Sequence, residues 1–181
     1  GVTFEELIEN YYFQAKALFE GDVDYFLLET CQDTRNIKAA LLAIEKLFED
    51  KKEKIPIAIS GTIEPMGTML AGQTVDALAT ALEHLALLYL GLNCATGPEF
   101  MTDHIRVLAN ESGFRVACVP NAGLPDEFGK YLETPESLSA VVRNFAKQGW
   151  LNIVGGCCGT TPEHIRALAD VASEFPPHQV T

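Results

Sequence analysis

The stretch Leu151-Asn152-Ile153-Val154-Gly155-Gly156-Cys157-Cys158-Gly159 joins a short apolar run to two adjacent cysteines with glycine on both sides. Neighbouring side chains on a strand point to opposite faces, so two adjacent thiols can serve one site only where the backbone bends sharply. Glycine permits such a bend at little steric cost. The pattern therefore predicts a buried strand whose end presents two thiols.

Four similar apolar runs precede this one. The five runs, rich in Ile, Val and Leu, cover residues 24–29, 55–60, 88–93, 115–120 and 151–154. Short, continuous apolar runs are typical of parallel strands that are covered on both faces. The amphipathic stretches around them predict helices at residues 4–19, 34–49, 74–87, 99–112, 134–148 and 161–174. We therefore expect an α/β fold with five strand-then-helix units after a first helix.

Polar residues stand at the carboxyl ends of the predicted strands. They are Glu29, Ser60, Asn93 with Cys94, Asn121, and Cys157 with Cys158. A site fed by every strand end is typical of a (β/α)8 barrel, whereas an open sheet gathers its ligands near one switch point. We predict a (β/α)8 TIM-barrel type with only about five of the eight βα units in this chain. The other three would lie in a part of the protein outside these residues; an unusual open assembly is the alternative.

Composition excludes several classes of function. The 181 residues are 48% hydrophobic, which is enough for one substantial core, and the formal net charge of −12 argues against a nucleic-acid surface. The sequence holds no apolar run long enough for a membrane span and shows no signal peptide. Five cysteines in such a chain indicate a reducing compartment, so we expect a cytoplasmic protein.

Three of the cysteines make a candidate zinc site. Cys94, Cys157 and Cys158 supply the three protein ligands typical of catalytic zinc, and the amide oxygen of Asn121 is the candidate fourth ligand in the absence of substrate. An all-thiolate site makes zinc a weak activator of water but suits a thiol substrate, which it presents as the nucleophilic thiolate. Glu29 could then recognise an ammonium group of that substrate.

Other interpretations of the cysteines stay open at this point. Cys157 and Cys158 could form a strained vicinal disulfide or be buried as small hydrophobic residues. Cys31 and Cys118 lie next to or inside apolar runs and are expected to be packing residues. His164 falls in a predicted helix, where a solvated or capping role is expected.

Several segments resemble the homocysteine-binding domain of cobalamin-dependent methionine synthase. They are LLET at 27–30, ISGTI at 59–63, GLNCATGP at 91–98, PNAGLP at 120–125 and NIVGGCCGTTP at 152–162. The resemblance runs from about Val2 to Glu174. The GGCCG segment alone would also admit the betaine- and S-methylmethionine-dependent homocysteine methyltransferases, while PNAGLP and SGTI favour the cobalamin enzyme.

The resemblance implies a zinc barrel with a defined set of site residues. Its zinc would be held by Cys94, Cys157 and Cys158, and Asn121 would ligate zinc until homocysteine arrives. Three further residues are expected to bind the substrate: Glu29 and Thr30, which match the region that holds the amino acid part of homocysteine, and Ser60. Residues 1–174 would form the homocysteine-binding domain and 175–181 a linker toward folate- and cobalamin-binding domains of the same polypeptide.

The resulting hypothesis is a methyltransferase in which zinc-bound homocysteine takes a methyl group from methylcobalamin and becomes methionine. In this chain it would be an incomplete catalytic unit. The alternatives are a betaine- or S-methylmethionine-dependent homocysteine methyltransferase and an inactive zinc-binding fragment of the barrel. Five units leave two sheet edges unpaired, so we also expect marginal stability or self-association.

Overall fold

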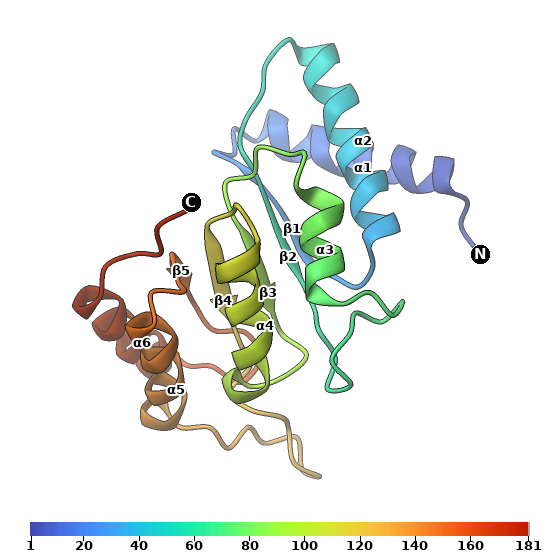
Figure 1. Ribbon diagram of the computed structural model, residues 1–181. Helices are drawn as coiled ribbons and strands as arrows, with labels where there is room; N and C mark the ends of the chain where they lie inside the picture. Colours follow the sequence, from blue (N-terminus) through green and yellow to red (C-terminus); the bar gives the residue numbers. More distant parts are fainter. Residues whose placement is uncertain (181) are drawn as a thin grey trace.

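One parallel sheet carries the fold, and its strands follow one another in chain order (Figure 1). The computed structural model describes residues 1–180. The strands are β1 (Phe26–Cys31), β2 (Ile57–Gly61), β3 (Leu90–Asn93), β4 (Val116–Val119) and β5 (Ile153–Val154). All four strand pairings are parallel. The prediction of five parallel strands alternating with helices is confirmed.

Six helices accompany the strands. They are α1 (Phe4–Glu20), α2 (Thr34–Lys51), α3 (Val75–Leu82), α4 (Pro98–Glu111), α5 (Pro135–Lys147) and α6 (Pro162–Glu174). The last three begin with proline, which is favoured there because the first helical N–H needs no partner. Five of the predicted helices agree with these bounds to within two residues.

The predicted helix at 74–87 is too long. α3 ends at Leu82, and the chain then makes tight turns in which the Leu85 N–H donates to the Leu82 carbonyl (2.9 Å). Leu85 and Leu87 pack against the core from this turn rather than from a helix. Their apolar side chains continue the helical pattern in the sequence, which explains the error.

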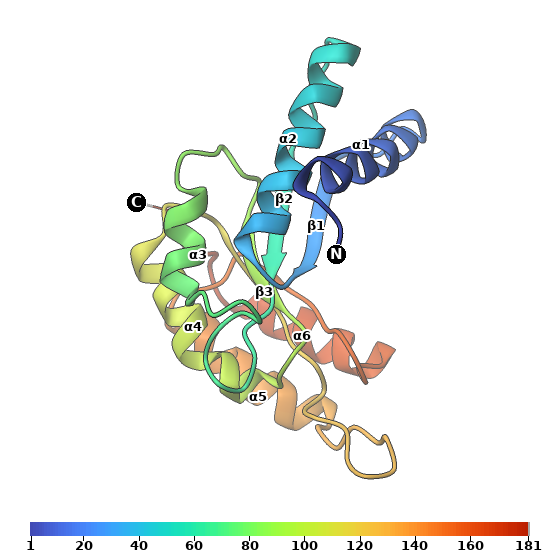
Figure 2. The same cartoon turned by 90° about the vertical axis from the view of Figure 1, so that its right-hand side faces the viewer.

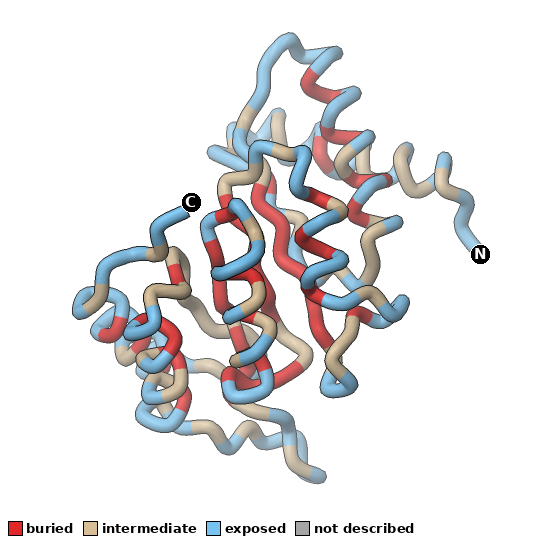
Figure 3. The backbone as a smooth tube through the Cα atoms, in the orientation of Figure 1, coloured by how far each residue is buried: buried red, intermediate tan, exposed pale blue. Residues whose placement is uncertain are grey.

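Along the curved sheet, α1 packs on α2, and α3, α4, α5 and α6 pack on one another in chain order (Figures 1 and 2). Most buried residues lie between these helices and the strands (Figure 3). A smaller cluster of Ala58, Tyr89 and Ala117 is separate from this core. Ala58 alternates along β2 with Ile59 of the main core, so the small cluster lies on the other face of the sheet.

Both edges of the sheet are unpaired among the described residues. Beside β1 lies a cavity of about 490 Å³, lined also by α1 and α2. Beside β5 lies a second cavity of about 440 Å³, lined also by α6 and residues 175–177. Each open edge therefore has an adjacent hollow. Within residues 1–180, no helix is long and apolar enough to cross a membrane.

The segment after α6 folds back toward the fifth strand. Phe175 packs against the main core, and the His178 N–H donates to the Leu151 carbonyl (2.9 Å). The Asn152 side-chain amide donates to the His178 carbonyl (2.9 Å). The assignment of this segment as a linker stays a prediction; its last residue, Thr181, lies outside the described residues.

Candidate metal centre

The strand register brings three carboxyl ends together. Asn93 of β3 lies opposite Val119 of β4, and Cys118 lies opposite Val154 of β5. Hydrogen bonds continue this pairing past the strands, because the Cys94 N–H donates to the Val119 carbonyl at 3.1 Å. On the other side, the Cys157 N–H donates to the Pro120 carbonyl at 2.8 Å. The cysteine after β3 and the pair after β5 therefore reach the same place across β4.

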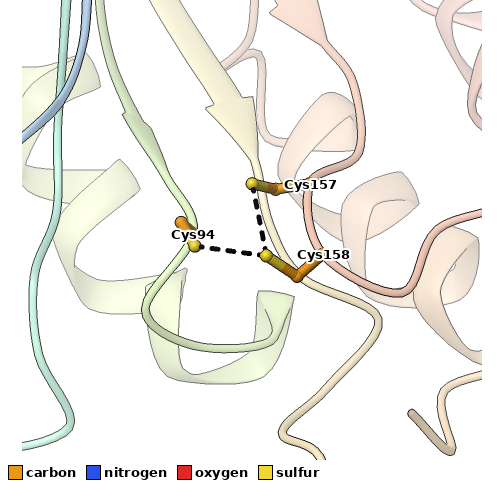
Figure 4. A group of neighbouring side chains, drawn as sticks. All are labelled: Cys94, Cys157 and Cys158. Carbon is orange, nitrogen blue, oxygen red and sulfur yellow. Dashed lines mark hydrogen bonds between the residues drawn. The ribbon is translucent and has the colours of Figure 1, made fainter. Parts of the chain in front are cut away.

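Three thiols meet there (Figure 4). The Sγ atoms of Cys94 and Cys158 are 3.6 Å apart, and those of Cys157 and Cys158 are 4.0 Å apart. All three sulfurs lie within 4.8 Å of one another. All are free thiols, since a disulfide bond would need a separation of about 2.05 Å. Cys157 is half-buried and Cys158 exposed, so neither a disulfide nor simple burial describes the pair.

The donor set fits a metal that prefers sulfur. Zinc lies about 2.3 Å from thiolate sulfur, so the edge of a regular tetrahedron around it would be about 3.8 Å. The separations of 3.6 and 4.0 Å lie on either side of that value. Thiolates select soft or borderline metals such as zinc. Cys94, Cys157 and Cys158 could therefore hold such an ion with little rearrangement.

The backbone around the thiols is unusual on both sides. Cys94 and Ala95 both have left-handed backbone angles, with φ of 58° and 59°, which cost energy in residues other than glycine. On the other side, a Cβ atom at Gly156 would lie 2.6 Å from the Thr160 side chain. Glycine at position 156 is therefore required by close packing and not by a positive φ.

The thiols differ in how easily they ionise. Burial works against ionisation of Cys94, but a hydrogen bond from the Ala95 backbone and others from neighbouring side chains outweigh it and lower the pKa of Cys94. These neighbours are Cys158, Cys157 and Asn121. At Cys157, burial and then the hydrogen bond and charge of Cys94 raise the pKa to about 11. Cys94 therefore ionises more readily than Cys157.

Asn121 lies against the cluster. Its side chain is buried, and its Oδ1 accepts the Cys158 N–H at 3.1 Å. The same side chain is one of the groups that lower the pKa of the Cys94 thiol. The structure therefore places Asn121 at the cysteine cluster.

Thr30 and Ser60 are linked to the cluster through Asn93, the residue before Cys94. Asn93 Oδ1 accepts from the Ser60 hydroxyl at 2.7 Å and from the Thr30 N–H at 3.1 Å. Asn93 Nδ2 donates to Thr30 Oγ1 at 2.9 Å. The sequence predicts Asn93 at a strand end but assigns it no role. The sequence did contain a signal for this role, because Asn93 is a single amide in an apolar strand, next to a candidate ligand.

Glu29 lies apart from the thiols. It is exposed on β1 and lines the cavity at that edge of the sheet, together with Thr30. None of the three clustered cysteines lines this cavity. The structure thus joins Asn121 to the thiol cluster by a hydrogen bond, and Thr30 and Ser60 to Asn93, the residue before Cys94. Glu29 is joined to neither.

The fold and the cluster together define an α/β protein with a barrel-like parallel sheet and a thiol site at the carboxyl ends of its strands. The chain belongs to the homocysteine S-methyltransferase family, whose model matches residues 1–172. The family part of the sequence-based prediction is confirmed.

Solved structures with the same fold include the homocysteine methyltransferase MmuM of Escherichia coli. Its apo form is 19% identical, with a TM-score of 0.71 over 94% of this chain and 59% of that one. The metallated form has the same identity and a TM-score of 0.65 over 90% of this chain and 51% of that one. The oxidized form gives 0.64 over 90% and 52%. The chain thus spans little more than half of these structures, and the prediction of a partial barrel is confirmed.

Proposed function

We propose that this chain is the homocysteine-binding part of a methyltransferase and that it holds zinc through Cys94, Cys157 and Cys158. The observation that carries the proposal is the meeting of three free thiols within 4.8 Å of one another, with two of the separations close to those of a tetrahedral zinc site. Membership of the homocysteine S-methyltransferase family supports it independently. A bound zinc ion would lower the pKa of the homocysteine thiol and keep it as the nucleophilic thiolate at neutral pH.

The protein's own groups would prepare this site. The lowered pKa of Cys94 favours its thiolate, the form that binds a metal. Asn121 Oδ1 accepts the Cys158 N–H and so holds the backbone of that ligand, and the same side chain helps to lower the pKa of Cys94. We propose that Asn121 Oδ1 is also the fourth ligand before homocysteine binds; that ligation would replace its hydrogen bond with the Cys158 N–H.

We propose that Thr30, Ser60 and Glu29 bind the amino acid part of homocysteine. Asn93 supports this assignment because it fixes the Thr30 backbone and the Ser60 hydroxyl next to Cys94. Glu29 is exposed on the same strand as Thr30, and its carboxylate could pair with the substrate ammonium group.

We propose methylcobalamin, carried by another domain of the same polypeptide, as the methyl donor. The support is the resemblance of ISGTI at 59–63 and PNAGLP at 120–125 to the cobalamin-dependent methionine synthases. The buried Ser60 and Asn121 lie in these two segments, and both make hydrogen bonds at the strand ends. In this proposal residues 1–174 form the homocysteine-binding unit and 175–181 lead toward the folate- and cobalamin-binding domains.

Metal analysis of serine variants tests the metal site. The chain is expected to retain one zinc ion, and Cys94→Ser, Cys157→Ser and Cys158→Ser are each expected to lose most of it. Cys31→Ser is the matched control, since Cys31 is a half-buried thiol outside the cluster. Stoichiometric zinc in all three cluster variants would contradict the proposal.

Two binding and transfer measurements test the substrate and the donor. Zinc-loaded chain is titrated with homocysteine, and with methionine as a control that lacks a free thiol. Absence of homocysteine binding at millimolar concentration would favour an inactive zinc-binding fragment. Methyl transfer by the protein that carries this chain is then compared for methylcobalamin, S-methylmethionine and betaine; transfer only from the last two would overturn the cobalamin proposal.

A further inference from the structure

The loop between β4 and α5 forms a compact turn next to the thiol cluster. Pro125 and Tyr131 pair as an antiparallel bridge, which closes the turn. Within it, Asp126 Oδ1 accepts the N–H groups of Phe128 (2.9 Å) and Lys130 (2.8 Å). Tyr131 therefore leaves the turn from a defined position.

Both ends of this loop are fastened to the segment that carries the cysteine pair. At the start, the Ala122 N–H donates to the Cys158 carbonyl at 2.8 Å. At the end, Nε2 of the buried His164 donates to the Glu133 carbonyl at 2.8 Å. The tautomer follows from the other ring nitrogen, Nδ1, which accepts the Thr161 N–H at 3.1 Å. His164 thus has the predicted capping role and also holds the loop in place.

Tyr131 lies directly on the cysteine turn. A Cβ atom at Gly159 would lie 2.2 Å from Cγ of the Tyr131 ring, so only glycine leaves room for the ring there. Gly159 also has a φ of +79°, which favours glycine for a second reason. Gly159 directly follows Cys158, so the Tyr131 ring lies beside the end of the cysteine pair. This packing places the phenol next to the thiol cluster.

We propose that Tyr131 is a positioning residue of the metal centre and that its hydroxyl donates a hydrogen bond to Cys158 Sγ. The inference rests on the proposed metal site and deepens it. A hydrogen bond to a thiolate draws charge away from the sulfur, so Cys158 would donate less charge to a bound metal. That metal would keep more of its positive charge, which would favour the thiolate form of a bound thiol substrate. In a site with three thiolate ligands, this counteracts their combined negative charge.

Cobalt(II) substitution tests the proposal without a turnover assay. Thiolate-to-cobalt charge-transfer absorption depends on the energy of the sulfur lone pairs. Tyr131→Phe keeps the ring on Gly159 and removes only the hydroxyl, so we expect the band to move to longer wavelength. We also expect roughly tenfold weaker cobalt binding in a chelator competition, the lower end of the range for groups that hydrogen-bond metal ligands. Tyr12→Phe is the control, because its hydroxyl binds Asp50 (2.6 Å) away from the cluster.

The outcomes separate the hydroxyl from the ring. An unchanged band and affinity in Tyr131→Phe would overturn the proposal. If Tyr131→Ala weakens binding while Tyr131→Phe does not, ring packing alone matters and the proposed hydrogen bond is wrong. If the unmodified chain binds no cobalt, the metal site itself is refuted, and this inference with it. If the unmodified chain binds cobalt and Tyr131→Phe changes neither the band nor the affinity, only the role of Tyr131 is refuted.

Discussion

The pKa of a cysteine thiol is raised in the middle of one strand and lowered just past the carboxyl end of its neighbour. Cys118, inside β4, is fully buried, and burial raises its pKa to about 12. Cys94, just past the end of β3, is also partly desolvated, but hydrogen bonds more than compensate and lower its pKa. Leu92 of β3 pairs with Cys118, so the two thiols are separated by two positions of register. A cysteine inside a strand is thus a core residue, whereas a cysteine just past the end of a strand can contribute its thiol to the site.

The largest test of this contrast is thiol reactivity in the metal-free chain. At neutral pH, the fraction of thiolate is roughly a thousandfold smaller for a thiol with a pKa of about 12 than for one at the ordinary value of 9.0. We expect iodoacetamide to modify Cys94 and Cys158 rapidly and to leave Cys118 unmodified, as read by peptide mass spectrometry. In denaturant all five cysteines should react at similar rates. Equal rates for Cys94 and Cys118 in the folded chain would break the comparison.

The tight packing of the strand middles can be tested at Gly91. A Cβ atom at this position of β3 would lie 2.6 Å from the Ala117 Cβ and 2.9 Å from the Ala117 carbonyl oxygen. Gly91→Ala is expected to lower the free energy of unfolding by about 3 kcal/mol, since the two strands would have to move apart. Gly113→Ala, with open space around the added atom, is the control and should change stability by less than about 0.5 kcal/mol. Urea denaturation measures both, and equal effects would contradict the close approach of β3 and β4.

At the strand ends, polar contacts replace apolar packing, and Asn93 tests their contribution. Asn93→Ala leaves the Ser60 hydroxyl, only 4% exposed, without its hydrogen-bond acceptor. The expected loss is about 2 kcal/mol of unfolding free energy, the cost of an unsatisfied buried polar group together with the lost bonds to Thr30. Asn10→Ala on α1 removes an exposed amide and serves as the control. A neutral Asn93→Ala would show that the strand ends do not depend on this network.

The smallest expected effect is the pH dependence that Cys118 imposes. Its pKa is raised in the folded state from an ordinary 9.0, so its contribution to stability is complete below pH 9 and is lost as the pH rises from 9 toward 12. Between about pH 8 and pH 10 this amounts to about 1 kcal/mol. Urea denaturation over this pH range should show a shallower decline of the unfolding free energy for Cys118→Ala than for the unmodified chain. Identical pH profiles for the two proteins would show that the buried thiol does not cause the decline.

Much of the fold follows from the order of apolar runs, but the bounds of β1 do not. The sequence predicts this strand at 24–29, and it lies at Phe26–Cys31. Asp22 has a positive φ in the turn that ends α1, and the pairing with β2 is irregular between Leu28 and Cys31, where Thr30 has a φ of 56°. Such local backbone geometry depends on the neighbouring strand, and residue propensities do not encode it.

The three thiols could be predicted as a group because parallel strands bring their carboxyl ends to one edge. Cys118 was correctly predicted as a packing residue, since it lies inside an apolar run and is buried. The contacts of Asn93 with Thr30 and Ser60 could not be derived, because they depend on the exact register of three strands. The placement of Tyr131 on Gly159 depends on how a long loop closes, which no sequence spacing indicates.

The sulfurs of Cys94 and Cys158 are 64 positions apart along the chain, and this separation has a thermodynamic consequence. An ion held by both would act as a cross-link that closes a long loop, as a disulfide does. For a loop of this length the lost entropy of the unfolded chain corresponds to about 4 kcal/mol. In a sheet with two open edges, that is a large share of the total stability of a small domain. The metal centre would then stabilise the packing of β3, β4 and β5 as well as serve as a reaction site.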